Sequence, residues 1–135
     1  LYDKTPATVR SLYESGLRLG VVTTKFRYRI EAILARDGLQ QYFEVIVGAD
    51  DVAQPKPDPE GLLLALGRLG IREDECLYVG DSTTDARAAQ AAGIRFVGVR
   101  TGLLNAKDFA PYTPWAVLDD VAALPAMLGL SFSGR

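Results

Sequence analysis

The chain has 135 residues, of which 48% are hydrophobic and 24% charged, and its formal net charge is −2. This composition is typical of one globular domain with a buried core, and the missing basic surplus argues against nucleic acid as a partner. The absence of histidine excludes Ser-His and Cys-His catalysis and histidine-ligated metal sites within this chain. No apolar run approaches the ~20 residues of a membrane span, and no signal peptide is recognisable, so a cytoplasmic location without a membrane partner is expected.

Short apolar strands alternate with helical patterns along the whole chain. In chain order, we predict a helix over 5–15, a strand over 17–24, a helix over 27–37, a strand over 44–47, a helix over 59–69, a strand over 75–80, a helix over 83–92, strands over 95–99 and 116–118, and a helix near 121–128.

Several helix ends carry recognisable signals. Asp58 is expected to cap the helix that follows it, with Pro59 at the first helical position. Glycine follows four of the predicted helices, at Gly16, Gly38, Gly70 and Gly93, where it can adopt the left-handed conformation that ends a helix.

Strands that alternate with helices pair in parallel through right-handed crossovers. The predicted fold class is therefore α/β, a doubly wound parallel sheet with helices on both faces, and residues 1–135 form one domain. In such sheets, ligands bind outside the carboxyl ends of the strands, so polar residues directly after strands are the candidate functional residues.

Three strand ends carry such residues. Thr23 and Thr24 follow the first predicted strand, Lys56 lies in a proline-rich loop after the second, and Asp81 and Asp85 follow the third. If the sheet is parallel, all of them lie on one edge.

These residue types suit phosphoryl transfer. The Thr23 hydroxyl can donate to a phosphoryl oxygen, and Lys56 supplies positive charge against the transferring group. Asp81 and Asp85 are four residues apart on one helix face, so their carboxylates can converge on Mg²⁺. Gly80 lets the backbone turn tightly and keeps a side chain out of the approach.

Each residue also has a purely structural interpretation. Thr23 could cap the next helix, Lys56 could be a solvated loop lysine, and Asp85 could be a first-turn acid that complements the helix dipole. Asp81 is harder to explain in this way, because an acid directly after a buried strand loses hydration. The combination of all four favours function.

Residues 21–24, 56–59 and 80–85 together resemble motifs II, III and IV of the haloacid-dehalogenase-like superfamily of hydrolases, in the same order and with matching spacing. The resemblance extends over about residues 1–102. Within the superfamily, residues 24–31 and 58–66 are most similar to the phosphoglycolate phosphatase branch, although pyrophosphatase and sugar-phosphate branches share these motifs.

The resemblance implies a mechanism and a set of roles. A Mg²⁺-dependent phosphatase of this family acts on a small phosphomonoester, such as phosphoglycolate, through an aspartyl-phosphate intermediate. By motif position, Thr23 and Lys56 would be catalytic, and both would bind substrate together with Thr24, where relatives often carry asparagine. Asp81 would ligate Mg²⁺, and Asp85 would ligate it or orient its surroundings.

The family's first motif, Asp-x-Asp-x-Thr after an apolar strand, is not found in this sequence, and neither is the helical cap that follows it in relatives. The resemblance therefore covers only the C-terminal core, without the first strand, the nucleophile or the cap. Because that strand lies in the middle of the sheet in this family, two parallel strand edges would be left unpaired. We expect an N-terminal segment or another chain to complete the sheet, and we expect the 135-residue chain alone to be inactive.

Other functional classes remain open to different degrees. A non-catalytic binding or scaffold module that keeps the fold is the main alternative to an enzyme. A receiver-like signalling domain is disfavoured, because its acid pair belongs near the first strand. A dinucleotide-binding domain is also disfavoured, since no Gly-x-Gly-x-x-Gly follows any strand.

Overall fold

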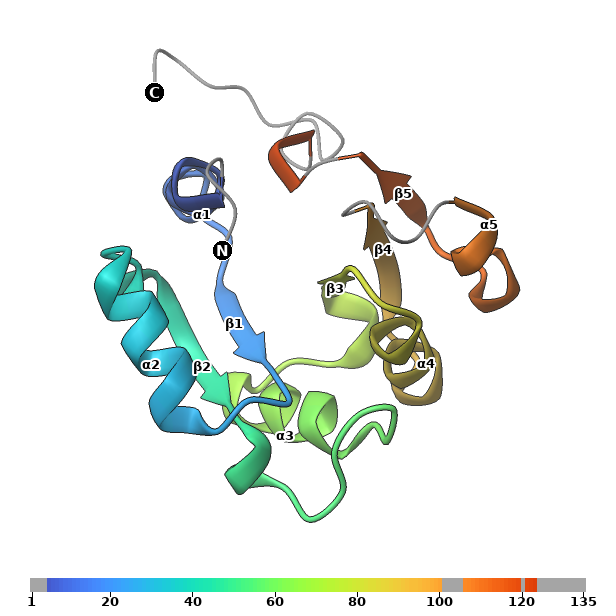
Figure 1. Cartoon of the computed structure of the whole chain (residues 1–135), viewed down its shortest axis with the longest axis horizontal. Helices are drawn as coiled ribbons and strands as arrows, with labels where there is room; N and C mark the ends of the chain where they lie inside the picture. The colour runs from blue at the N-terminus through green and yellow to red at the C-terminus, as the bar shows by residue number, and fades with distance from the viewer. Residues whose placement is uncertain (1–4, 101–105, 120, 124–135) are drawn as a thin grey trace.

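The computed structural model of the chain describes residues 5–100, 106–119 and 121–123. Its helices and strands, in chain order, are α1 Thr5–Glu14, β1 Leu19–Val22, α2 Arg27–Arg36, β2 Phe43–Val47, α3 Glu60–Leu69, β3 Leu77–Gly80, α4 Thr83–Ala92, β4 Arg95–Val99, α5 Ala106–Phe109 and β5 Ala116–Leu118 (Figure 1). Four short 3₁₀ turns in the described ranges lie between them, at η1 Gln40–Tyr42, η2 Ala49–Asp51, η3 Glu73–Glu75 and η4 Ala110–Tyr112, and η5 Val121–Ala123 follows β5. None of the helices in these ranges is long and apolar enough to cross a membrane.

The predicted elements are confirmed in type and order, with differences at their ends, and the short helix α5 was not predicted. The first strand begins two residues later and ends two residues earlier than expected. The third strand begins at Leu77 rather than at residue 75, because Glu75 is the last residue of η3. The last predicted helix begins as the turn η5, and its continuation past residue 123 lies outside the described residues.

The start of α3 differs from its prediction by one residue. Pro59 occupies the capping position rather than the first helical position, and α3 begins at Glu60. Asp58 still satisfies an orphan donor of the first turn, since its Oδ1 accepts a hydrogen bond from the Glu60 N–H at 3.0 Å. The glycine stops are confirmed, because Gly70 and Gly93 have φ of 68° and 75° at the C-caps of α3 and α4, and Gly38 follows α2 with φ of 69°.

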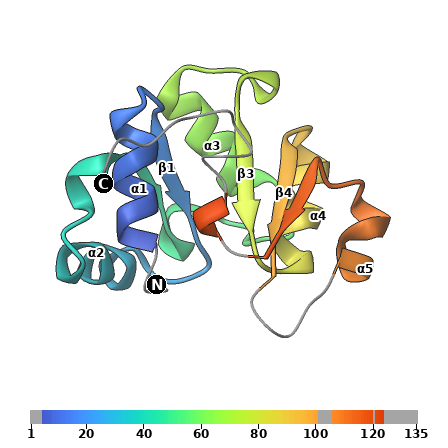
Figure 2. The same cartoon turned by 90° about the horizontal axis from the view of Figure 1, so that it is seen from above.

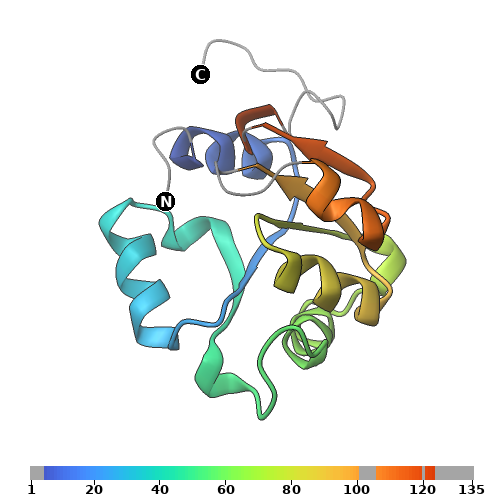
Figure 3. The same ribbon diagram turned by 45° about the vertical axis from the view of Figure 1, so that its right-hand side comes forward.

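All strand pairs are parallel, but they form two separate sheets. β1 pairs with β2, whereas β3, β4 and β5 pair in that order. Within the described residues no ladder joins β1 to β3, so the strand edges expected to lack a neighbour are the edges of β1 and β3. Figures 1 and 3 show the β1–β2 pair and the three-stranded sheet in opposite halves of the molecule.

Helices bridge the two sheets. On one face, Leu12 of α1 lies in a cluster that includes Leu19 of β1 and Leu77 and Val79 of β3. On the other face, Leu62 of α3 lies in a cluster that also contains residues of α4 and Phe96 of β4. Val22 of β1 packs against that cluster. Figure 2 shows α1 beside β1, with α3 between the two strand groups. Shared apolar clusters, rather than backbone hydrogen bonds, therefore hold the two halves together.

The two strands at the boundary are less buried than β4, the central strand of the three-stranded sheet. No residue of β1 and none of β3 is fully buried, whereas Phe96, Val97, Gly98 and Val99 of β4 all are. Strands in parallel sheets are normally covered on both faces and paired on both edges. β1 and β3 are thus covered only in part where they meet this boundary.

Candidate active site

Thr23 and Thr24 lie where the prediction put them, directly after β1. The Thr23 N–H donates to the Val47 carbonyl at 2.9 Å, which continues the ladder with β2, and its Oγ1 accepts from the Lys25 N–H at 3.2 Å. Thr23 does not cap α2, because the N–H of Arg27 donates instead to Asp50 Oδ1 at 2.9 Å. The capping interpretation of Thr23 is therefore wrong. Thr24 is exposed beside it.

Lys56 does not extend into solvent, as a solvated loop lysine would. Its ammonium donates to the Val22 carbonyl at 3.2 Å, to the Tyr78 hydroxyl at 2.6 Å and to Asp85 Oδ1 at 2.6 Å. An ammonium has three N–H donors, and these partners can engage all of them. Lys56 thereby links the end of β1, the middle of β3 and the first turn of α4.

Asp85 forms the anionic half of this arrangement. Its carboxylate pairs with Lys56, and the two side chains are only 12% and 10% exposed. Its backbone N–H donates to the Ser82 hydroxyl at 3.1 Å, which caps α4. A Cβ at position 80 would lie 2.6 Å from Asp85 Oδ2, so Gly80 provides the space that the Asp85 carboxylate occupies.

Asp81 differs from Asp85 in its environment. It follows Gly80 at the end of β3 and is exposed, whereas Asp85 is buried. Its negative charge is close enough to contribute to the raised pKa of Tyr78, after the larger effects of burial and of Asp85. An exposed carboxylate on this edge is accessible to a ligand from solvent.

Tyr78 is the residue of this site that the sequence interpretation missed. Its hydroxyl lies 3.2 Å from both the Val22 carbonyl and Asp85 Oδ1, and its ring lies 5.3 Å from the Lys56 nitrogen. Burial, followed by the charge of Asp85, raises the pKa of Tyr78 above its usual range, so the hydroxyl stays protonated at neutral pH. The sequence did contain a hint of this role, because Tyr78 places a hydroxyl within an apolar strand and a buried tyrosine O–H needs a hydrogen-bond partner.

Asp81 and Asp85 are carboxylates that could hold Mg²⁺, but they do not form a complete metal site by themselves. Within the described ranges, no group of three or more Asp, Glu, His or Cys side chains gathers to hold a metal. Mg²⁺ is commonly held by one or two carboxylates, with waters and substrate phosphate as its other ligands, and Asp81 and Asp85 are donors of that kind. Asp81 is the accessible donor, whereas Asp85 is engaged with Lys56.

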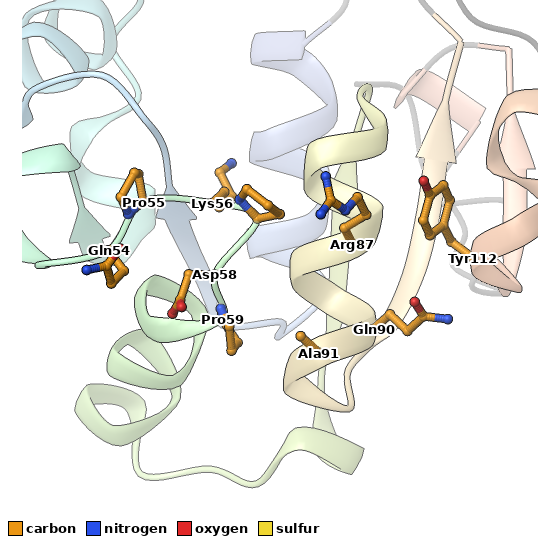
Figure 4. A pocket seen from close by; sticks show the side chains of 10 residues that line it. Gln54, Pro55, Lys56, Asp58, Pro59, Arg87, Gln90, Ala91 and Tyr112 are labelled. Atoms are coloured by element: carbon orange, nitrogen blue, oxygen red, sulfur yellow. The ribbon is translucent and has the colours of Figure 1, made fainter.

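A groove of about 720 Å³ lies on the outer side of the Lys56 loop. Figure 4 shows residues of this loop on one side and Arg87 and Gln90 of α4 on the other, with Tyr112 beyond the helix. The groove shares Lys56 with the strand-end site and does not include Thr23 or Asp81 in its lining.

The structure brings the predicted residues to one edge. Lys56 and Asp85 are in direct contact, and Thr23 directly follows Val22, whose carbonyl binds Lys56. Asp81 begins the turn that leads from β3 to Asp85. Their individual roles in binding and catalysis stay predictions.

The sequence is similar to those of known hydrolases and phosphatases. The sequence profile of the haloacid dehalogenase-like hydrolases matches residues 1–99. The chain is 40% identical over 133 residues to a phosphoglycolate phosphatase of Pectobacterium atrosepticum, covering 98% of this chain and 57% of the relative. It is 36% identical over 129 residues to the pyrophosphatase PpaX of Bacillus velezensis, covering 96% of this chain and 60% of the relative.

Solved structures show the same fold. A haloacid dehalogenase-like hydrolase from Bacteroides fragilis superimposes with a TM-score of 0.88 at 41% identity, covering 92% of this chain and 59% of that one. The chain thus spans little more than half the length of the proteins it resembles.

Proposed function

Because the chain belongs to the haloacid dehalogenase-like hydrolase family, we propose that it is the C-terminal core of a Mg²⁺-dependent phosphatase that hydrolyses a small phosphomonoester. The observation that carries the proposal is the Lys56 ammonium, which is held between three elements at the carboxyl edge of the strands. The named activity of the phosphoglycolate phosphatase relative favours a phosphoglycolate-like substrate.

In this proposal, the residues of the chain bind and neutralise the phosphoryl group. The Thr23 hydroxyl donates to a phosphoryl oxygen, and Thr24 contacts the same group from its exposed position. Lys56 offsets the negative charge of the phosphoryl group and of the attacking carboxylate, at a fixed point in space. Asp81 would hold Mg²⁺, with Asp85 as a second ligand or an orienting group, and the ion when bound would supply Lewis-acid charge to the phosphoryl oxygens.

The nucleophile is proposed to come from outside the 135 residues. In the full-length protein, an aspartate would attack phosphorus and break the ester P–O bond, which releases the alcohol and forms an aspartyl phosphate. Water would then hydrolyse this intermediate to inorganic phosphate and the free aspartate. The 135-residue chain alone would then have no turnover. Cytoplasmic location and a small phosphorylated metabolite as partner belong to the same proposal.

The open boundary between β1 and β3 is proposed to receive one further strand. Both strands are parallel to their neighbours and half-buried, and Leu19, Leu77 and Val79 share one apolar cluster there. A strand from an N-terminal segment or from another chain would pair with both edges up to the Val22 carbonyl, which already accepts from Lys56 and Tyr78, and would deliver its terminal residues next to Thr23 and Lys56.

A kinetic experiment tests the proposal. The full-length protein is assayed with p-nitrophenyl phosphate and 2-phosphoglycolate, in Mg²⁺ and in EDTA. We expect turnover in Mg²⁺ only, and we expect Asp81→Asn and Lys56→Met each to reduce kcat/KM by roughly 100-fold or more, as loss of a charge-stabilising group does. Asp74→Asn, which changes an exposed carboxylate paired with Arg72, is the matched control and should leave turnover unchanged.

Two results would contradict the proposal. Turnover that persists in EDTA would exclude the metal role of Asp81. Absence of turnover with a panel of phosphate esters would favour the alternative, a non-catalytic binding or scaffold module of this fold.

A further inference from the structure

Tyr78 occupies the centre of the polar contacts that hold Lys56. Its hydroxyl accepts a hydrogen bond from the Lys56 ammonium at 2.6 Å and lies 3.2 Å from Asp85 Oδ1 and from the Val22 carbonyl. We propose that Tyr78 is a positioning residue, whose hydroxyl sets the direction of the Lys56 ammonium for phosphoryl transfer. This inference rests on the proposed function and assigns Tyr78 a role within it.

The lysine side chain is intrinsically flexible. An ammonium on a four-carbon stem is a mobile point charge, and an ion pair with Asp85 alone would leave it free to rotate about the carboxylate. Its other two partners limit that freedom, because Val22 belongs to β1 and Tyr78 to β3. Of the two, Tyr78 makes the shorter contact, so its hydroxyl constrains the ammonium most directly.

The Tyr78 hydroxyl also lies within hydrogen-bond distance of two acceptors, Asp85 Oδ1 and the Val22 carbonyl. It has one proton, which it can donate either to Asp85 or to the Val22 carbonyl, while its oxygen accepts from Lys56. Tyr78 therefore connects the cation to its counter-ion and to the end of β1. This geometry gives the hydroxyl a role that core packing of the ring does not require.

The aromatic ring can be separated from the hydroxyl by substitution. The ring packs against Phe96 at a centroid distance of 6.3 Å, within the apolar cluster that α4 covers. Phenylalanine would keep this packing and the ring contact with Lys56, and would remove only the oxygen. Tyr78→Phe is consequently a direct probe of the hydroxyl.

The first test is a double-mutant cycle in the full-length protein, with p-nitrophenyl phosphate as substrate. We expect Tyr78→Phe to lower kcat about tenfold with KM changed less than twofold, and to have less than a twofold effect when Lys56 is already methionine. Equal effects of Tyr78→Phe in both backgrounds, or an unchanged kcat, would overturn the proposal, because the hydroxyl would then not act through Lys56.

Tyr42→Phe is the matched control. Tyr42 is half-buried in a different apolar cluster, and its hydroxyl has no hydrogen-bond partner among the described residues. It should leave kcat unchanged. Thermal melting of all variants shows whether each one folds.

A second measurement does not depend on enzymatic activity. In ¹H–¹⁵N spectra of lysine ammonium groups, a group held by three acceptors exchanges its protons slowly enough to give a signal, which is assigned to Lys56 by its loss in Lys56→Met. We expect Tyr78→Phe to broaden or shift this signal while Tyr42→Phe leaves it unchanged. If the full-length protein has no phosphatase activity, the proposed function fails and this signal still decides the positioning role. An unaltered signal in folded Tyr78→Phe would overturn it.

Discussion

At the scale of single residues, the site depends on how closely Gly80 and Asp85 approach each other. The Asp85 carboxylate turns back toward the end of β3, where it meets the Lys56 ammonium, and the missing side chain of Gly80 makes that position available. Gly80 is not in the left-handed region, so its requirement is steric rather than conformational. A buried carboxylate and its counter-ion therefore depend on one glycine.

This steric requirement predicts opposite effects for two glycine-to-alanine substitutions. Gly80→Ala should destabilise the protein by about 1–3 kcal/mol, because its Cβ would overlap the Asp85 side chain at 2.6 Å. Gly67→Ala should be neutral or stabilising by up to about 1 kcal/mol, because Gly67 lies within α3 and its Cβ would meet open space. Urea unfolding of both variants measures the difference. A Gly80→Ala variant as stable as the parent protein would contradict the packing argument.

At the scale of elements, the turns after β1 and β2 are fastened together. The Ala49 N–H donates to the Lys25 carbonyl at 2.8 Å, and Arg27 donates to the Ile46 carbonyl at 2.8 Å and to Asp51 Oδ2 at 3.2 Å. The same Asp51 oxygen accepts from the Gly48 N–H at 2.8 Å. These contacts fix the turn that contains Thr23 relative to the end of β2.

Because Asp51 accepts two of these hydrogen bonds, their contribution to the stability of the fold depends on pH. The hydrogen bond from the Gly48 N–H, and then those from Arg27, hold the pKa of Asp51 below its ordinary value of about 3.9. A carboxylate whose pKa is lower in the folded state stabilises the fold above the unfolded pKa, and this stabilisation is lost as the pH falls through the folded pKa.

We therefore expect Asp51→Asn to lower the free energy of unfolding by about 1 kcal/mol at pH 7, since it weakens hydrogen bonds to a charged group. The deficit should shrink as the pH falls below the ordinary value of about 3.9 and toward the lower pKa of the folded state, where the parent protein also loses the charge. Urea midpoints between pH 7 and pH 3 measure it, with Asp74→Asn as the exposed control. A deficit that is constant over this range would show that the charge of Asp51 is not responsible.

At the scale of the whole molecule, the chain has two halves joined by helices and by the Lys56 contacts. The N–H groups of a strand alternate between its two sides. Thr23 donates toward β2, so Val21 shares that side, while Gly20 and Val22 face the boundary with β3. The Val22 carbonyl on that boundary accepts hydrogen bonds from side chains, those of Lys56 and Tyr78.

Amide hydrogen exchange can detect whether another strand fills this boundary. In the 135-residue chain, we expect the amides of Gly20 and Val22 to exchange at least about tenfold faster than those of Val21 and Thr23, because only the latter face β2. In the full-length protein, all four should be comparably protected. Gly20 and Val22 amides that stay unprotected there would exclude a strand between β1 and β3.

The sequence alone determined the order and type of the helices and strands other than α5, the parallel α/β class and the edge that carries Thr23, Lys56, Asp81 and Asp85. It could do so because helix periodicity, glycine stops and the position of polar residues after strands are local properties of the chain. Only the tertiary structure decided that Lys56 pairs with Asp85, that Gly80 clears space for this pair and that the Tyr78 hydroxyl joins it. These contacts connect residues from different elements, and their geometry depends on how strands and helices pack, which no local pattern records.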